Sequence, residues 1–250
     1  MEKKDGIFYF KKFAVSHSRS SMKVGVDGVL IGAWANPDGE RILDVGCGSG
    51  LISLMMAQRN PYAEIIGIDI DKPSVEEAYQ NFAISQWKDR LRCFLLSFDE
   101  VEATDLFPGK GFDLIVSNPP FFDSGMKILD NSRKIARHKG SLSPEILINK
   151  AACLLNPRGK LAMVVPVQYS DYLLIAAKNS HLLPKRITYV RYHDTSTIKR
   201  VLLEFGLQSE FILNNMNPSD LEENSLTMFN SDGTPTIAYR NLCHNFYLKF

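Results

Sequence analysis

The stretch Ile42–Met56, ILDVGCGSGLISLMM, joins a short apolar run to a segment typical of a helix through a turn rich in glycine. The three glycines follow Asp44 with the spacing GxGxG, at Gly46, Gly48 and Gly50. Glycine adopts positive φ readily and lets a backbone approach a ligand closely. A dinucleotide-binding GxGxxG turn would need glycine in place of Leu51, and the lysine with serine or threonine of a phosphate-binding loop is missing. The stretch therefore predicts a strand, a ligand-binding turn and a helix.

Strand-like and helix-like segments alternate through the rest of the chain. The strand-like segments are Arg41–Val45, Glu64–Asp69, Leu91–Leu96, Phe112–Val116, Lys160–Val165, Lys185–Tyr192 and Arg200–Gly206. The helix-like segments are Leu51–Gln58, Lys72–Trp87, Pro144–Leu155 and Tyr169–Asn179. This alternation predicts an α/β fold, a doubly wound and mostly parallel seven-stranded sheet covered on both faces. The last two strands are joined by only His193–Lys199, too short for a helical crossover, so the final strand should be antiparallel.

The composition suits a single domain. At 250 residues and 45% hydrophobic content, the chain can bury a sizeable core. We expect 1–250 to form one domain, in which 1–40 are an extension before a core of 41–250. The 29 basic and 28 acidic residues give no overall charge that would indicate a nucleic-acid partner, so evidence for one must come from local clusters.

Several classes of protein are disfavoured. No apolar run approaches the roughly 18 residues of a membrane helix, and the start MEKKDG leads into no signal-peptide core. The four cysteines lie far apart without a CxxC pair, at Cys47, Cys93, Cys153 and Cys243. We therefore predict a cytoplasmic protein with no membrane association, no metal site and no obligate protein partner.

An acidic residue ends each of the first two predicted strands. Asp44 would repel a pyrophosphate but attract a cationic group, and Asp69 is placed to accept hydrogen bonds from ribose hydroxyls. S-adenosylmethionine has an ammonium, a sulfonium and a ribose but no phosphate, so it fits both carboxylates. The alternative is a tight turn with an acid that caps the helix.

The fourth predicted strand breaks into Asn118–Phe121, the Asn-Pro-Pro-Phe turn, beside the glycine turn. Its prolines lack N–H donors and fix φ, so the turn should be rigid. The Asn118 side chain and the Pro119 carbonyl can accept hydrogen bonds from the amine of adenine or of an amide, and these bonds strengthen as the nitrogen gains positive character. Phe121 offers a face for a planar group. Together, Asn118, Pro119, Pro120 and Phe121 predict methyl transfer to a planar nitrogen.

LDVGCGSG, Asp69 and SNPPF together resemble class I methyltransferases that act on exocyclic or amide nitrogens. Three longer segments, Phe8–Ala35, Ala136–Leu147 and Thr234–Phe250, resemble the bacterial valine-tRNA adenine-37 methyltransferases. This resemblance spans almost the whole chain. It implies transfer of a methyl group from S-adenosylmethionine to the exocyclic amine of an adenine in tRNA.

The resemblance also implies the residues of the site. Met22–Gly32 would cover the cofactor, with contacts from Lys23, Gly25, Asp44, Gly46, Gly48, Gly50, Asp69, Ile70, Ser97, Phe98 and Asn118. Ser97 stands where relatives often have an acid that reads the cofactor's adenine, and Phe121 replaces a common tyrosine, which keeps stacking but loses a hydroxyl. The implied phosphate contacts are Lys11, Lys12, His17, Arg19, Arg133, Lys134, Arg137 and Lys139.

Three alternatives stay open. A methyltransferase of protein glutamine makes the same demands on the Asn-Pro-Pro-Phe turn, although such enzymes carry a helical amino-terminal domain and only about forty residues precede the first core strand here. A methyltransferase of the guanine amine in RNA carries the same motif. An inactive protein that binds S-adenosylmethionine or RNA is the non-enzymatic alternative.

Overall fold

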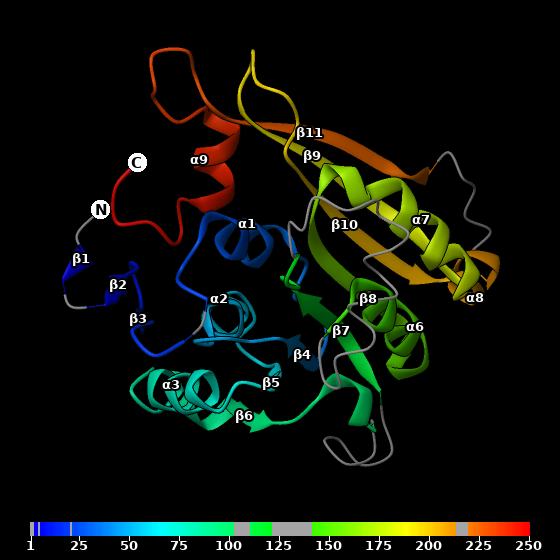
Figure 1. The fold of residues 1–250 in the computed structure, drawn as a ribbon, viewed down its shortest axis with the longest axis horizontal. Coiled ribbons are helices and arrows are strands. Elements are labelled where there is room, and N and C mark those ends of the chain that lie inside the picture. Colours follow the sequence, from blue (N-terminus) through cyan, green and yellow to red (C-terminus); the bar gives the residue numbers. More distant parts are fainter. Residues whose placement is uncertain (1–2, 5, 21, 103–110, 122–141, 214–219) are drawn as a thin grey trace.

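The computed structural model describes residues 3–4, 6–20, 22–102, 111–121, 142–213 and 220–250. Its centre is an eight-stranded sheet in the order β11-β9-β10-β8-β7-β4-β5-β6 (Figure 1). The strands are β4 (Arg41–Val45), β5 (Glu64–Asp69), β6 (Leu91–Leu95), β7 (Phe112–Ser117), β8 (Leu155–Pro166), β9 (Leu182–His193), β10 (Arg200–Leu207) and β11 (Glu222–Phe229). Strands β6, β5, β4, β7 and β8 run parallel, while β10 is antiparallel to both of its neighbours, which confirms the predicted α/β fold.

Helices cover both faces of this sheet (Figure 1). The α-helices are α1 (Val26–Trp34), α2 (Leu51–Arg59), α3 (Lys72–Ala83), α6 (Pro144–Leu154), α7 (Ser170–Asn179), α8 (Gln208–Leu213) and α9 (Ile237–Cys243). Short 3-10 helices are η1 (Lys88–Arg90), η2 (Phe98–Glu100) and η3 (Val167–Tyr169). Successive strand residues face opposite layers, so Leu202 belongs to the apolar core that α1, α2, α3 and α9 share, whereas Leu203 belongs to the core on the side of α6 and α7. Within the described residues, no helix is long and apolar enough to cross a membrane.

The eighth strand, β11, extends the predicted seven at one edge. It pairs in parallel with β9, from Glu222 opposite Arg186 to Phe229 opposite His193. Its first four residues are exposed, and only Leu226 and Met228 are buried. An edge strand that buries so little shows little hydrophobic pattern. The predicted helix Lys72–Trp87 was also too long, because α3 ends at Ala83.

A small antiparallel sheet precedes α1 and lies beside the carboxyl-terminal segment (Figure 1). Its strands are β1 (Lys3–Lys4), β2 (Ile7–Tyr9) and β3 (Ala14–Ser16). The Lys11 N–H donates to the Phe246 carbonyl at 2.8 Å, and the rings of Phe8 and Phe10 pack on Tyr247. These aromatic side chains join the same apolar core as α1 and α2.

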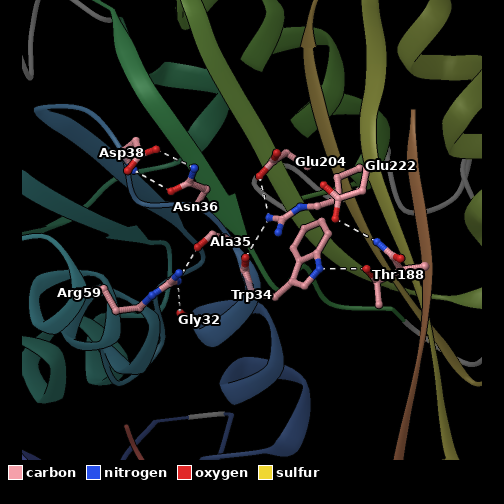
Figure 2. Close-up of polar contacts among 11 residues, drawn as sticks. Gly32, Trp34, Ala35, Asn36, Asp38, Arg59, Thr188, Glu204 and Glu222 are labelled. Atoms are coloured by element: carbon pink, nitrogen blue, oxygen red, sulfur yellow. Dashed lines mark hydrogen bonds and ion pairs between the residues drawn. The ribbon is translucent and has the colours of Figure 1, made fainter. Parts of the chain in front are cut away.

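The carboxyl end of α1 is fixed by two arginines (Figure 2). Arg186 stacks on the Trp34 ring, with its Cζ 3.7 Å from the ring centroid, and donates to the Trp34 carbonyl at 2.9 Å. Trp34 Nε1 donates to Thr188 Oγ1 at 3.0 Å, and Arg59 donates to the Gly32 carbonyl at 3.0 Å. Cations at this end donate hydrogen bonds to the last carbonyls and interact favourably with the negative end of the helix dipole. These contacts attach α1 to α2 and β9, and so they also fix where its amino-terminal end lies.

Candidate active site

A cavity of about 810 Å³ opens where β4, β5 and β7 end. Its size is in the range of small-molecule sites, and the carboxyl edge of a parallel sheet is where such folds bind ligands. Of the residues assigned from sequence, the cavity is lined by Lys23, Gly25, Gly46, Gly48, Asp69, Ile70, Phe98, Asn118 and Pro120. The donor and acceptor motifs, separate in sequence, therefore share one cavity.

The glycines of the glycine turn (Gly46–Gly50) have two different functions. Gly46, Gly48 and Gly50 all have positive φ, at 70°, 54° and 82°. Gly46 and Gly48 line the cavity, and the Gly46 N–H donates to the Ile68 carbonyl at 2.9 Å, which joins the turn to β5. Gly50 is outside the lining, and a Cβ there would lie 2.4 Å from Phe82 Cε1. Gly50 is therefore required by the packing of the turn on α3.

Asp44 lies beneath the glycine turn and is fully buried. Contrary to the expectation from sequence, it does not line the cavity. Its Oδ2 accepts hydrogen bonds from the Ser53 backbone at 2.9 Å and from Ser53 Oγ at 2.7 Å. Burial raises the pKa of Asp44 to about 7 in spite of these bonds. Its Oδ1 is buried and receives no hydrogen bond from the described residues. The carboxylate thus ties the first turn of α2 to β4 and keeps one free acceptor.

Asp69 lines the cavity directly. Its Oδ2 accepts from the Gly48 N–H and its Oδ1 from the Asp71 N–H, both at 2.9 Å. Burial raises the pKa of Asp69, although these hydrogen bonds act against the shift. Each carboxylate oxygen can accept two hydrogen bonds, so the carboxylate retains acceptor capacity for a ligand. The neighbouring Ile70 is 54% exposed, which leaves an apolar surface beside this carboxylate.

Ser97 and Phe98, both expected to contact the cofactor, follow β6 and have different surroundings. Phe98 lines the cavity and is 4% exposed, whereas Ser97 is outside the lining. Leu96 completes an apolar wall with Phe98. Ser97, which stands where relatives often have an acidic residue, therefore does not reach the cavity. The wall formed by Leu96 and Phe98 is an apolar surface on which a ligand can pack.

The cavity's second side is the N-terminal wall, Met22–Gly28, which leads into α1. Lys23 Nζ donates to the carbonyls of His17 at 2.6 Å and Ser18 at 3.0 Å. Asp27 lines the cavity and accepts from Arg200 Nε at 2.7 Å, a contact that sequence reasoning missed. The sequence signal for Asp27 is its acidic side chain in the first turn of a helix, where the helix dipole favours a negative charge.

The Asn-Pro-Pro-Phe turn is anchored at its start. Ser117 Oγ donates to the Val45 carbonyl at 2.8 Å, which ties the end of β7 to the end of β4. Asn118 follows directly and lines the cavity, with its Nδ2 3.8 Å from Met22 Sδ. Phe121 is outside the lining, and its ring packs on Tyr169 at a centroid distance of 5.1 Å. Pro119 is buried and also outside the lining.

The residues expected to contact phosphate have varied surroundings. His17 is 5% exposed and its Nδ1 accepts from the Val24 N–H at 3.2 Å, so little of its side chain reaches the surface where a phosphate contact was expected. Lys11 Nζ donates to the His244 carbonyl, and Arg19 pairs with Glu76. Lys12 is exposed. Arg133, Lys134, Arg137 and Lys139 lie outside the described residues. In the part of the chain that the structure describes, no group of three or more His, Cys, Asp or Glu side chains could hold a metal ion.

Comparison with known proteins identifies related sequences. The family model "Methyltransferase small domain" matches residues 17–189. A "tRNA1(Val) (adenine(37)-N6)-methyltransferase" of Flavobacterium johnsoniae is 38% identical over 97% of this chain and 100% of that protein. Proteins with the same name in Bacteroides thetaiotaomicron and Phocaeicola vulgatus are 41% and 44% identical, over 81% and 79% of this chain and 84% and 82% of theirs.

Solved structures resemble the fold. A predicted O-methyltransferase from Agrobacterium tumefaciens matches 88% of this chain and 96% of its own, with a TM-score of 0.64 and 17% identity. A 16S rRNA methyltransferase of T. thermophilus, in complex with AdoMet and guanosine, matches 78% of this chain and 47% of its own, with a TM-score of 0.54 and 21% identity. At such identities the likeness shows the fold alone.

Proposed function

The chain belongs to the family of tRNA1(Val) (adenine(37)-N6)-methyltransferases, and from this premise we propose how it transfers a methyl group from S-adenosylmethionine to the exocyclic amine of adenine 37 in valine tRNA. One observation carries the assignment of the site. Asn118 lines the same cavity as Gly46, Gly48 and Asp69, so the acceptor's amine and the methyl donor can meet there.

The cavity suits S-adenosylmethionine. We assign Asp69 to the ribose hydroxyls, because its oxygens retain acceptor positions toward the cavity. Ile70 and Phe98 would pack on the adenine ring, and the backbone of the glycine turn would pass close to the amino-acid part. The uncommitted Oδ1 of Asp44 suits a bridging water or a cationic group, because buried oxygens are rarely left without a donor. When bound, S-adenosylmethionine supplies a methyl group on positively charged sulfur, already activated for transfer.

The protein's contribution to the reaction comes from the Asn-Pro-Pro-Phe turn. The Asn118 side-chain oxygen and the Pro119 carbonyl would each accept one N–H of the adenine amine, and both bonds strengthen as the nitrogen becomes positive. Phe121, supported by Tyr169, would offer its face to the flipped base. Two hydrogen bonds of about 1–3 kcal/mol each correspond to roughly 10²- to 10⁴-fold in rate. Rigid placement by the two prolines allows this gain without reorganisation.

The RNA would lie across the exposed basic residues near the amino terminus. We propose that Lys12, Lys11 and Arg19 neutralise phosphates, together with the basic residues of 133–139 outside the described part. Because Phe8, Phe10 and Val15 join the core of the catalytic sheet, we propose that 1–40 belong to one domain with 41–250. We place the activity in the cytoplasm on the grounds of the tRNA substrate.

The function is tested by incubating the protein with labelled S-adenosylmethionine and, separately, unmodified total tRNA, release-factor protein and duplex DNA. Label should enter tRNA alone, and nucleoside mass spectrometry should find it on the exocyclic amine of adenine. Label in release-factor protein alone would overturn the tRNA assignment, and label on guanine would overturn the choice of base.

A further inference from the structure

Helix α3 carries a row of buried polar side chains that takes no part in the cavity lining. The row consists of Ser74, Glu77 and Asn81, which are 0–1% exposed. Their spacing of three and four residues puts them on one face of the helix. Burial of polar groups is unfavourable unless they are hydrogen-bonded, so their partners indicate what the row does. We call this row the polar seam.

Glu77 gathers five hydrogen bonds from one short segment, Ser16–Ser20. Its Oε2 accepts from the Ser20 N–H at 2.8 Å. Its Oε1 accepts from the N–H groups of Ser18 at 2.8 Å and Arg19 at 3.1 Å, and from the hydroxyls of Ser16 at 3.0 Å and Ser18 at 3.2 Å. Burial raises the pKa of Glu77, but these donors outweigh it and leave the pKa below its usual value. The carboxylate therefore fixes the path of the chain just before the N-terminal wall.

Asn81 connects the same segment to the opposite side of the cavity. Its Oδ1 accepts from the Ser16 N–H at 2.9 Å, and its Nδ2 donates to the Ser16 carbonyl at 2.8 Å. The Nδ2 also donates to the carbonyl of Ser49, within the glycine turn, at 2.8 Å. The third member, Ser74, shares a hydrogen bond of 3.1 Å with the hydroxyl of Ser20, which in turn donates to the Met22 carbonyl. One helix face thus holds both sides of the cavity.

Given the proposed function, we propose that Glu77 and Asn81 are positioning residues that set the N-terminal wall against the glycine turn before the cofactor binds. Without these contacts the cofactor itself would have to order the wall. The affinity for the cofactor would then be reduced in proportion to the fraction of molecules in which the wall is already in place. The methyl-transfer step should change little, because the Ser117 contact with Val45 anchors the turn that carries Asn118 and the contact of Asn118 with Met22 in the wall, at 3.8 Å, is weak. The polar seam therefore acts on cofactor binding rather than on the transfer step.

The test compares Glu77→Gln with Glu76→Gln. Both changes remove one negative charge from adjacent positions, but Glu76 is half exposed and, within the described residues, forms ion pairs with the side chains of Arg19 and Lys72. In Glu77→Gln the Kd for S-adenosylmethionine by calorimetry and its KM with saturating tRNA should rise at least fivefold. The kcat should stay within twofold of wild type, and Glu76→Gln should keep all three values within twofold.

A second variant keeps the test decisive if Glu77→Gln fails to fold by circular dichroism. Asn81→Asp has the same size but loses the donors to Ser16 and Ser49, and it should show the same rise in Kd with an unchanged kcat. A wild-type Kd in a folded Glu77→Gln or Asn81→Asp protein, or a fall in kcat as large as the fall in kcat/KM, would overturn the positioning role. Failure of the proposed function shows instead in the wild-type protein, as absence of tRNA methylation, and leaves the Kd comparison valid.

Discussion

The two sides of the cavity are built in different ways. On the sheet side, Gly46 and Asn118 directly follow β4 and β7, and Asp69 is the last residue of β5. The side chains of these three strands are almost all buried. On the other side, the N-terminal wall is held through the side chains of Glu77 and Asn81, which bond a segment about 60 residues away in sequence. The sheet side therefore has the rigidity of the core, while the N-terminal wall depends on a few polar contacts. We therefore expect the sheet side to govern the transfer step and the direct contacts with the cofactor, and the N-terminal wall to govern cofactor affinity alone.

The largest effect should come from the sheet side. Asn118→Ala removes one acceptor for the adenine amine, so kcat should fall at least tenfold, the effect of a hydrogen bond of about 1–3 kcal/mol. The Kd for S-adenosylmethionine should stay within threefold, because Asp69 and the glycine turn are untouched. Single-turnover methylation and calorimetry measure the two quantities. A variant with near-normal turnover would contradict the assigned role of Asn118.

Asp69→Asn tests whether the sheet side also contributes affinity. The amide keeps one oxygen acceptor but loses the charge and one acceptor facing the Gly48 and Asp71 N–H groups. We expect the Kd for S-adenosylmethionine to rise about tenfold, since a hydrogen bond to a charged group is worth about 1.5–3 kcal/mol. The matched control is Asp38→Asn, an exposed aspartate outside the cavity lining. Equal Kd values in the two variants would remove Asp69 from the cofactor site.

Asp44→Asn should change how stability depends on pH. The pKa of Asp44 is raised from 3.8 to about 7 in the folded protein, so the folded state binds this proton more tightly than the unfolded state. Its contribution to stability is fully present below the unfolded pKa and is lost as pH rises through the folded pKa of about 7. The asparagine variant should lose less stability between pH 5 and pH 8 than wild type, as measured by urea unfolding without cofactor. Parallel pH profiles would contradict the raised pKa.

The smallest effect is expected at the surface. Lys12→Glu should weaken tRNA binding a few-fold and lower the salt dependence of log Kd by about one ion, with no change in the Kd for S-adenosylmethionine. Lys11 is a less suitable probe, because its Nζ also bonds the carbonyl of His244 after α9. Filter binding at several salt concentrations measures the slope. If affinity and slope both stay constant, Lys12 is only a solvated side chain.

Prediction from the sequence was most accurate for the buried strands of the sheet and for the residues at their carboxyl ends. Buried strands such as β4 and β5 are mostly apolar, and the residues at their carboxyl ends reach the cavity through the topology of the sheet, as Gly46 and Asp69 do. The same reasoning assigned Asp44 to the cavity, because position along a strand does not reveal that a carboxylate points beneath the turn.

What sequence reasoning missed depends on contacts between distant segments. The burial of His17 and the partners of Glu77 arise from the packing of Ser16–Ser20 on α3, which no local pattern reports. The first helix was expected only as a covering segment. Its Gly28 and Gly32 are a signal in hindsight, since a Cβ at Gly32 would lie 2.5 Å from Met55 Sδ and the two helices pack closely there.

The pairing of β2 and its neighbours with the carboxyl-terminal segment has a consequence for biosynthesis. Lys11 contacts a residue 233 positions later, and the bridge between Phe10 and Tyr247 lies close by. A nascent chain cannot close this junction until His244 and Tyr247 have left the ribosomal exit tunnel. The strands of the sheet can assemble before that point, whereas the contacts of Phe10 and Lys11 with the segment after α9 form later.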